Sequence, residues 1–249
     1  MAGDAPRSEE VLSKVLAGLK TLFDQELESV VLYGSATGSD FQPGVSDLNL
    51  LVVVSAQGLG HLDRLVFPAS QWAKNRVTPP LVMTSQELER SSDVFPLEIL
   101  NMQLSRRVLH GPDPLASIKI EPGNLRLQCE RELRGKLIVL REAFLSSRGR
   151  EDELLRTALA SIKALVAICR GVLHLLGENP SRLNSAEVLD RTATKLGLAH
   201  GKVLIEVWRL RGAARPVRGK MPELFQRYLT AVAEAAESVD RLGGQKEAQ

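Results

Sequence analysis

The stretch Val30-Val31-Leu32-Tyr33-Gly34-Ser35, together with Ser46-Asp47-Leu48-Asn49-Leu50-Leu51-Val52-Val53-Val54, decides the fold. Two apolar, β-branched runs flank a loop rich in Gly, Ser and Pro, which predicts two neighbouring strands. Gly34-Ser35 can present backbone N–H groups and a hydroxyl to a phosphate, because glycine allows close approach and positive φ. Asp47 and Asn49 are two apart in an extended segment, so their side chains share a face. A phosphate cradle facing two oxygen ligands is expected of a metal–nucleotide site.

These residues resemble the signature of the nucleotidyltransferase superfamily, typified by DNA polymerase β and the aminoglycoside adenylyltransferases. That signature is an apolar residue, Gly, Gly or Ser, a spacer of about a dozen residues, and two carboxylates flanking one apolar residue. Here the spacer runs over residues 36–46, and its Pro43-Gly44-Val45-Ser46-Asp47 turn also resembles the family's. The chain departs from the pattern at one position, because Asn49 stands where the second carboxylate is expected.

The resemblance implies an α+β protein, with a small mixed β-sheet nucleotidyltransferase domain followed by an all-α helical bundle. It implies Mg²⁺ or Mn²⁺ held by Asp47, Asn49 and a third carboxylate from a later strand, which also accepts the acceptor's proton. Glu98 is the best match, since it is an acidic residue in the apolar run 95–104, which we expect to be extended. The alternative is an edge-strand glutamate facing water, and Asp93 is then the replacement.

Hydrophobic periodicity predicts how the rest of the chain is organised. In the first half it favours helices over 8–23 and 58–75, a short strand at 81–83 and a turn at 110–114. From residue 123 onward it predicts helices alone, over 124–148, 152–176, 185–196, 202–210 and 222–242. We therefore expect a nucleotidyltransferase-like domain over residues 1–117 and a helical bundle over residues 118–249.

Composition indicates a soluble protein of the cytoplasm. No apolar run approaches the roughly 20 residues that cross a bilayer, and the first ten residues are polar and acidic rather than signal-like. Cys129 and Cys169 lie in helical patterns without metal-ligand spacing, which indicates buried free thiols in a reducing compartment. Aromatic residues make up only 4% of the chain, which argues against a nucleic-acid partner that stacks bases on aromatic rings.

The two halves differ in charge. Residues 1–117 carry 9 basic and 14 acidic side chains, and residues 118–249 carry 23 and 16. In the second half Arg134 and Arg141 are seven residues apart on one predicted helix, so they share a face that could bind the β- and γ-phosphates of a nucleotide. The alternative is a solvated face with intrahelical ion pairs, because Glu130, Glu132 and Glu142 interleave with the basic cluster of this helix. That cluster comprises Arg126, Arg131, Arg134, Lys136 and Arg141.

Two functions remain open. The first is metal-dependent transfer of a nucleoside monophosphate, AMP above all, from a nucleoside triphosphate to a hydroxyl of a small molecule or a protein. Gly34 and Ser35 would hold the phosphates, Asp47, Asn49 and Glu98 the metal, and Asp47 and Glu98 would be catalytic. The second is a catalytically inactive nucleotide-binding or protein-interaction module of the same fold, because Asn49 brings an oxygen ligand but no charge. The acceptor and the oligomeric state stay open.

Overall fold

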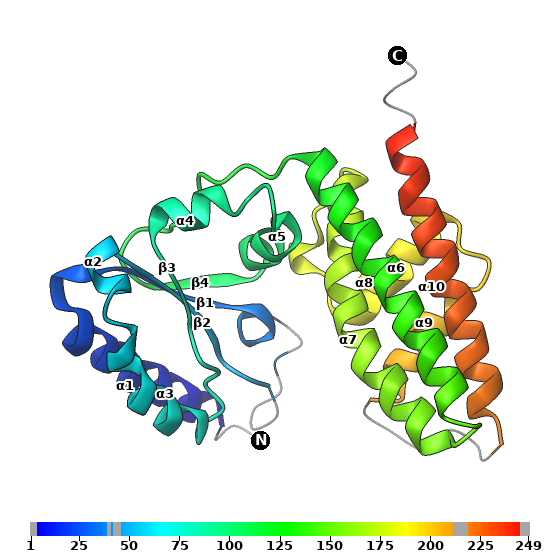
Figure 1. Cartoon of the computed structure of the whole chain (residues 1–249), viewed down its shortest axis with the longest axis horizontal. Helices are drawn as coiled ribbons and strands as arrows, with labels where there is room; N and C mark the ends of the chain where they lie inside the picture. The colour runs from blue at the N-terminus through cyan, green and yellow to red at the C-terminus, as the bar shows by residue number, and fades with distance from the viewer. Residues whose placement is uncertain (1–3, 39–40, 42–45, 212–218, 245–249) are drawn as a thin grey trace. The chain divides into compact units, whose positions relative to one another are not determined.

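The protein consists of two compact units, one of mixed α/β structure and one of helices alone. A computed structural model describes residues 4–38, 41, 46–211 and 219–244 (Figure 1). Contacts group residues 1–94 with 98–120, and residues 95–97 with 121–249. A small mixed sheet followed by a helical region confirms the predicted fold class. The Pro43-Gly44-Val45 part of the predicted turn lies outside the described residues.

In the part of the chain that the structure describes, the sheet has four strands in the order β3-β2-β1-β4. β1 pairs antiparallel with β2 and β4, and β2 pairs parallel with β3, which makes the sheet mixed. The strands are β1 (Leu27–Tyr33), β2 (Asn49–Val54), β3 (Leu81–Met83) and β4 (Arg106–His110). Gly111, directly after β4, has φ +71°, and a Cβ there would lie 2.0 Å from the carbonyl oxygen of Glu28 on β1. Only glycine fits this contact, so Gly111 allows the end of β4 to pack on β1.

Helices cover both faces of the sheet. α1 (Asp4–Phe23) and α3 (Val66–Ala73) lie on one face, and α4 (Ser85–Arg90) and α5 (Pro96–Leu104) lie on the other (Figure 1). Side chains alternate along β2: Leu50 and Val52 pack with α1, whereas Leu51 and Val53 pack with α4 and α5. Two short helices, α2 (Ala56–Leu59) and a 3₁₀ turn (Leu62–Leu65), lead into α3.

The extended run predicted over residues 95–104 is wrong, because this segment is helix α5. Pro96 occupies the first helical position, where its fixed φ favours a helix and its missing N–H costs nothing. Leu97 and Leu100 are both buried, as are Ile99 and Met102, and the spacing of three in each pair is helical. A short apolar run is compatible with the period of a strand and with that of a helix, and here Pro96 favours the helix.

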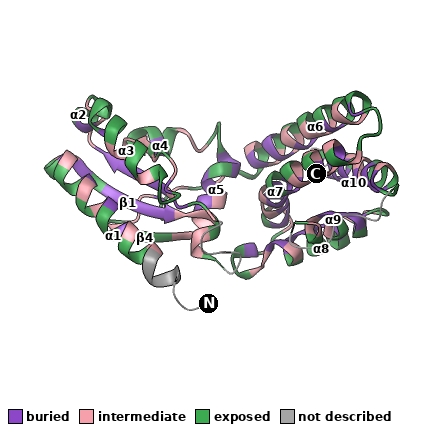
Figure 2. Ribbon diagram, turned by 90° about the horizontal axis from the view of Figure 1, so that it is seen from below, coloured by how far each residue is buried: buried purple, intermediate pink, exposed green. Residues whose placement is uncertain are grey.

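Over its described residues, the helical unit contains five α-helices, four of which pack around α7. They are α6 (Pro122–Ser146), α7 (Glu151–Leu175), α8 (Ser185–Leu196), α9 (Lys202–Arg209) and α10 (Met221–Gly244). α7 contacts each of the other four, and the purple parts of its ribbon in Figure 2 mark its buried residues. By length and composition alone α7 could cross a membrane, but half of its most apolar window is buried inside the protein.

Both cysteines are buried and free, as the sequence predicts. Cys129 lies on α6 and Cys169 on α7. Burial raises the pKa of the Cys169 thiol to about 12, which keeps it protonated and unreactive at neutral pH.

Candidate functional site

The predicted site residues of β1 and β2 meet at one end of the sheet. Tyr33, the last residue of β1, pairs with Asn49, the first residue of β2. Gly34 follows with φ +83°, and its N–H donates to the carbonyl oxygen of Ser105 at 2.9 Å. A Cβ at Gly34 would lie 3.2 Å from Nδ2 of Asn49, so glycine is favoured here by both backbone and packing. Ser35 is exposed at this end of the sheet.

The Asn49 side chain is bonded to the neighbouring segment of chain. Its Oδ1 accepts a hydrogen bond from the hydroxyl of Thr78 at 3.0 Å. Thr78 is held in place through its own N–H, which donates to the carbonyl oxygen of Leu48 at 3.1 Å. One of the two lone pairs of the carboxamide oxygen that could ligate a metal therefore already accepts a hydrogen bond from the protein.

Asp47 forms an ion pair with an arginine. Nη2 of Arg76 lies 3.2 Å from Oδ1 of Asp47, and each side chain is about half exposed (48% and 49%). Arg76 has φ +62°, in the left-handed region that non-glycine residues rarely adopt. Its carbonyl oxygen accepts a hydrogen bond of 2.8 Å from the N–H of Leu48, between Asp47 and Asn49 in sequence.

Glu98 lies in the first turn of α5 and is exposed. A carboxylate is favourable there irrespective of catalysis, because the helix N-terminus carries a partial positive charge. α5 packs on the face of the sheet to which Leu51 belongs, and strand alternation directs Asn49 to the same face. The role of Glu98 as metal ligand and proton acceptor stays a prediction, now from a helix rather than a strand.

The oxygen ligands that Asp47 and Asn49 offer do not fit a site for two divalent ions. Such ions favour several carboxylates, and Asp47 supplies one that already faces the guanidinium of Arg76. Asn49 adds no charge, and the segment that pairs with β2 over residues 77–84 has no acidic residue. Over the described part of the chain, no group of three or more His, Cys, Asp or Glu side chains is placed to hold a metal ion. The expectation of bound Mg²⁺ or Mn²⁺ therefore has no support in the arrangement of these side chains.

The fold has a counterpart among solved enzymes. No protein-family model matches the chain, and no curated protein matches it. The chain is similar in structure to spectinomycin adenyltransferase AAD(9) from Enterococcus faecialis, whose crystal structure was determined with ATP and spectinomycin. The TM-score is 0.54 and the sequence identity 15%, over 90% of this chain and 99% of that one. The chain has a nucleotidyltransferase fold. At this identity the likeness shows the fold alone.

Within this nucleotidyltransferase fold, the structure adds three polar residues, Thr78, Tyr33 and Arg106, beside the predicted Asn49. Thr78, Asn49, Tyr33 and Arg106 form a row across the sheet, since Tyr33 pairs with Asn49 on one side and Arg106 on the other. Arg106 at the start of β4 is neutralised by Asp113, with Nε 2.8 Å from Oδ2. Burial raises the pKa of the Tyr33 hydroxyl, which stays protonated at neutral pH. These residues belong to strand ends and turns, for which the sequence offered no motif.

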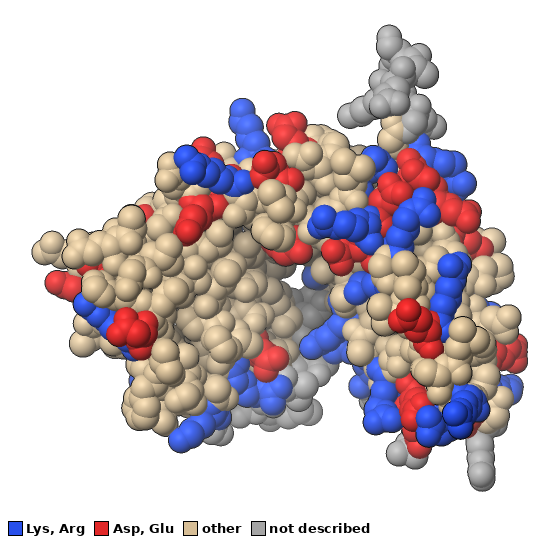
Figure 3. Space-filling model, in the orientation of Figure 1, with Lys and Arg blue, Asp and Glu red and all other residues tan. Residues whose placement is uncertain are grey.

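The two arginines predicted to bind phosphates lie on α6 of the helical unit. Arg134 bonds to Glu130 on its own helix, with Nε 2.7 Å from Oε1, and to Asp240 on α10, with Nη2 3.0 Å from Oδ2. Arg141 is exposed on the same helix. Figure 3 shows basic and acidic side chains interleaved over α6 and α10. Arg134 thus takes part in the ion pairs that the sequence offered as its alternative, and phosphate binding by Arg134 and Arg141 stays a prediction.

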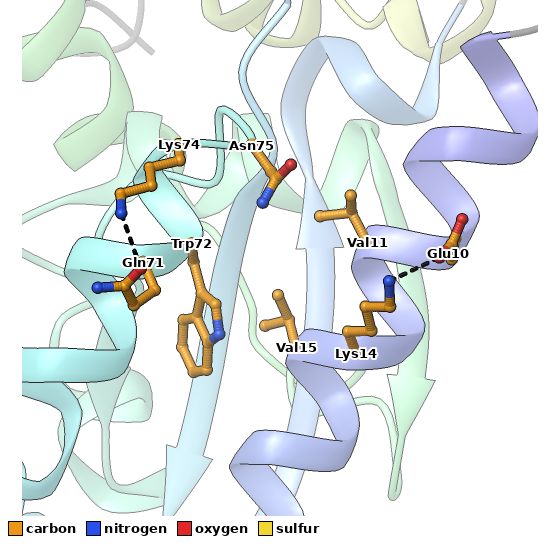
Figure 4. Close-up of a pocket in the computed structure, with 8 residues that line it drawn as sticks. All are labelled: Glu10, Val11, Lys14, Val15, Gln71, Trp72, Lys74 and Asn75. Carbon is orange, nitrogen blue, oxygen red and sulfur yellow. Dashed lines mark hydrogen bonds and ion pairs between the residues drawn. The ribbon is translucent and has the colours of Figure 1, made fainter.

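A separate pocket of about 450 Å³ lies between α1 and α3, on the face of the sheet opposite Leu51 (Figure 4). Its polar groups bond to one another: Lys14 pairs with Glu10 at 2.6 Å, and Lys74 donates to Gln71 at 3.0 Å. Its lining comprises Glu10, Val11, Lys14, Val15, Gln71, Trp72, Lys74 and Asn75. None of the predicted site residues lines it, so it is distinct from the end of the sheet described above.

Proposed function

We propose that this protein binds a nucleoside triphosphate at the Gly34–Ser35 end of β1 and does not transfer the nucleotide to an acceptor. The observation that carries the proposal is the engagement of both motif side chains by the protein itself. Asp47 pairs with Arg76, and Asn49 accepts from Thr78. Nucleotidyl transfer needs metal ions to stabilise the attacking and leaving oxygens, and these two side chains offer one paired carboxylate.

Three features support nucleotide binding. The nucleotidyltransferase fold is shared with an enzyme whose structure contains ATP. Ser35 is exposed directly after a glycine with positive φ, at the end of a central strand. The half-exposed guanidinium of Arg76 lies at the same end of the sheet, and guanidinium groups bind phosphate oxygens well.

The second candidate function is transfer of AMP from ATP to a hydroxyl of a small molecule or a protein. The adenyltransferase with the same fold and the presence of Asp47 favour it. In that case Asp47→Ala abolishes pyrophosphate release, and Asn49→Asp preserves or raises it.

Pyrophosphate release and nucleotide binding, measured on the same protein, separate the two functions. Release is followed with ATP, GTP, CTP and UTP, with Mg²⁺ or Mn²⁺, and with spectinomycin among the acceptors. Calorimetry measures the affinity for each nucleotide. We expect heat of binding, and release no faster in the wild type than in Asp47→Ala. Faster release in the wild type would establish the enzyme instead, and absence of binding to every nucleotide would remove the proposal.

A further inference from the structure

The turn that carries Arg76 has an unusual residue at its strained position. The turn closes α3 with two backbone hydrogen bonds, from Val77 N to Trp72 O (3.3 Å) and from Arg76 N to Ala73 O (3.0 Å). This is the Schellman pattern, in which the residue with positive φ is usually glycine. Arg76 occupies it with φ +62°, although asparagine, which tolerates this region better, directly precedes it as Asn75. Asp24 and Arg148 are also non-glycine residues with positive φ, so strain alone does not mark a site; at Arg76 the strain coincides with the contact to Asp47.

The same turn is bonded to β2 beside the two motif residues. Leu48 N donates to Arg76 O at 2.8 Å, and Thr78 N donates to Leu48 O at 3.1 Å. Both contacts use the residue between Asp47 and Asn49, so the position of the turn relative to Asp47 is fixed by backbone. As a result, the Arg76 guanidinium is placed 3.2 Å from the carboxylate of Asp47.

We propose that Arg76 is the built-in cation of this site, so that a nucleoside triphosphate binds through its guanidinium without a divalent metal. This inference rests on the proposed function. A guanidinium is charged at every physiological pH and has five N–H donors, so it can bind phosphate oxygens while staying beside a carboxylate. About half of the Arg76 side chain faces solvent, which leaves it accessible to a ligand.

The proposal predicts that Mg²⁺ does not increase the affinity for ATP, in contrast to a site that binds the nucleotide through the metal. A Mg²⁺ ion on the triphosphate occupies phosphate oxygens that Arg76 would bind, and it brings two further positive charges next to the guanidinium. Chelation of Mg²⁺ should therefore leave ATP binding unchanged or tighten it. A site that holds the metal through Asp47 and Asn49 would lose affinity under the same treatment.

The test is calorimetric titration of the full chain with ATP, once in EDTA and once in excess Mg²⁺. Arg76→Asn removes the charge but tolerates the left-handed backbone, and Arg76→Lys keeps the charge without the planar fork. Lys74→Gln is the matched control, because it removes one positive charge from the same turn and lies in the α1–α3 pocket instead. Arg76→Gly is a second charge-free variant, with the least backbone strain.

We expect the wild type to bind ATP in EDTA at least as tightly as in Mg²⁺. Arg76→Asn and Arg76→Gly should weaken binding about tenfold, which equals about 1.4 kcal/mol. Lys74→Gln should change affinity by less than about twofold, since surface charges at a distance are screened. The melting temperature of Arg76→Gly should be unchanged or about 2 °C higher, because relief of backbone strain offsets the lost ion pair. If the role of Arg76 were purely structural, Arg76→Gly would lower the melting temperature and leave the affinity for ATP unchanged.

Two results overturn the inference while the proposed function stands: ATP binding that requires Mg²⁺, and ATP binding that is insensitive to Arg76→Asn. No ATP binding under either condition removes the proposed function, and the inference with it. Pyrophosphate release that depends on Asp47 also removes both, and it is recognised separately because ATP is then consumed.

Discussion

The polar groups of the sheet end and those of the helical unit are satisfied in different ways. In the helical unit, charged side chains pair with neighbours one helical turn away or on the adjacent helix, as Glu130 does with Arg134. At the sheet end, Asp47 and Asn49 pair with Arg76 and Thr78, each 29 residues away in sequence. Local helical pairs need no backbone strain, whereas the pair at Asp47 depends on a residue with positive φ. Strain at a long-range polar contact therefore distinguishes the candidate site from surface charge.

The two tryptophans allow this comparison to be tested one unit at a time. Trp72 lies on α3 in the α/β unit and Trp208 on α9 in the helical unit. Variants that keep one of them report urea unfolding of that unit by fluorescence. Each prediction below sets a change in the α/β unit against a change in the helical unit.

The largest effect is expected for Gly111→Ala at the end of β4. The new Cβ would lie 2.0 Å from the carbonyl oxygen of Glu28, in a backbone conformation with φ +71°. We expect a loss of about 3 kcal/mol in the free energy of unfolding of the α/β unit. Gly149→Ala in the helical unit is the control, with φ +78° and no atom within 4 Å of the new Cβ. It should cost about 1 kcal/mol, from backbone strain alone. Equal costs for the two variants would show that the clash is relieved by movement of β4.

The next effect concerns Gly34→Ala in the candidate site. Its φ of +83° adds strain, and its Cβ would approach Nδ2 of Asn49 to 3.2 Å. We expect a loss of about 2 kcal/mol in stability of the α/β unit, together with weaker ATP binding. Gly177→Ala, with φ +78° and an open environment at the end of α7, should cost about 1 kcal/mol. In the Asn49→Ala background the two glycine substitutions should cost the same, and a persistent difference would contradict the contact with Asn49.

A smaller difference in stability is expected between removal of a buried hydroxyl group, that of Tyr228, and removal of a half-buried one, that of Thr78. Tyr228 is fully buried in the helical unit, and its hydroxyl lies 2.8 Å from that of Ser161. Tyr228→Phe should cost about 1 kcal/mol, because Ser161 keeps its bond to the carbonyl oxygen of Ala158. Thr78→Val should cost about 0.5 kcal/mol, since water can replace the hydroxyl beside the partly exposed Asn49. If Thr78→Val lowers the free energy of unfolding more than Tyr228→Phe does, water does not reach the Asn49 side chain as we infer.

The smallest effect is the pH dependence of the helical unit. The hydrogen bond from Arg134 lowers the pKa of Glu130 below its usual 4.5, and that from Lys195 does the same for Glu178. A carboxyl group with a lower pKa in the folded than in the unfolded state stabilises the protein fully above about pH 4.5. That stabilisation is lost as pH falls through the folded pKa.

We therefore expect the urea midpoint reported by Trp208 to fall between pH 5 and pH 3. Glu130→Gln should flatten this dependence by about 0.5 kcal/mol, as is typical of an ion pair with a half-exposed partner such as Arg134. Glu130 pairs with both Arg126 and Arg134, so an unchanged pH dependence in Glu130→Gln would mean that neither pair contributes to stability.

Much of the fold could be predicted from the sequence because its patterns are local. The alternating and β-branched residues of 30–33 and 48–54 gave two strands of the sheet, and the Leu and Val periodicity after residue 123 gave the helices. The prediction for residues 95–104 was wrong because a ten-residue apolar run is compatible with both the two-residue period of a strand and the 3.6-residue period of a helix. Pro96 marks the start of the helix. β4 was missed because its start, Arg106-Arg107, is basic and the strand does not alternate between buried and exposed residues.

About half of the residues of the candidate site could be predicted from the sequence in the same way. Gly34, Asp47 and Asn49 carry a spacing that can be read directly, and the structure brings them together at the sheet end. Arg76 and Thr78 carry none, because their contacts depend on a turn whose left-handed residue the sequence would place at Asn75. A partner fixed by backbone bonds between distant segments has no signature in one sequence.

The central claim is that Asp47 and Asn49 are held by protein partners and do not form a metal site. Titration with Mn²⁺, followed by loss of the electron paramagnetic resonance signal of the free ion, tests it most directly. The wild type is compared with the Asn49→Asp, Arg76→Asn double variant, in which Thr78 can still donate to the new carboxylate. We expect no binding above that of an Asp47→Asn control in the wild type, and a new Mn²⁺ site in the double variant. Stoichiometric Mn²⁺ binding by the wild type that disappears in Asp47→Asn would contradict the claim.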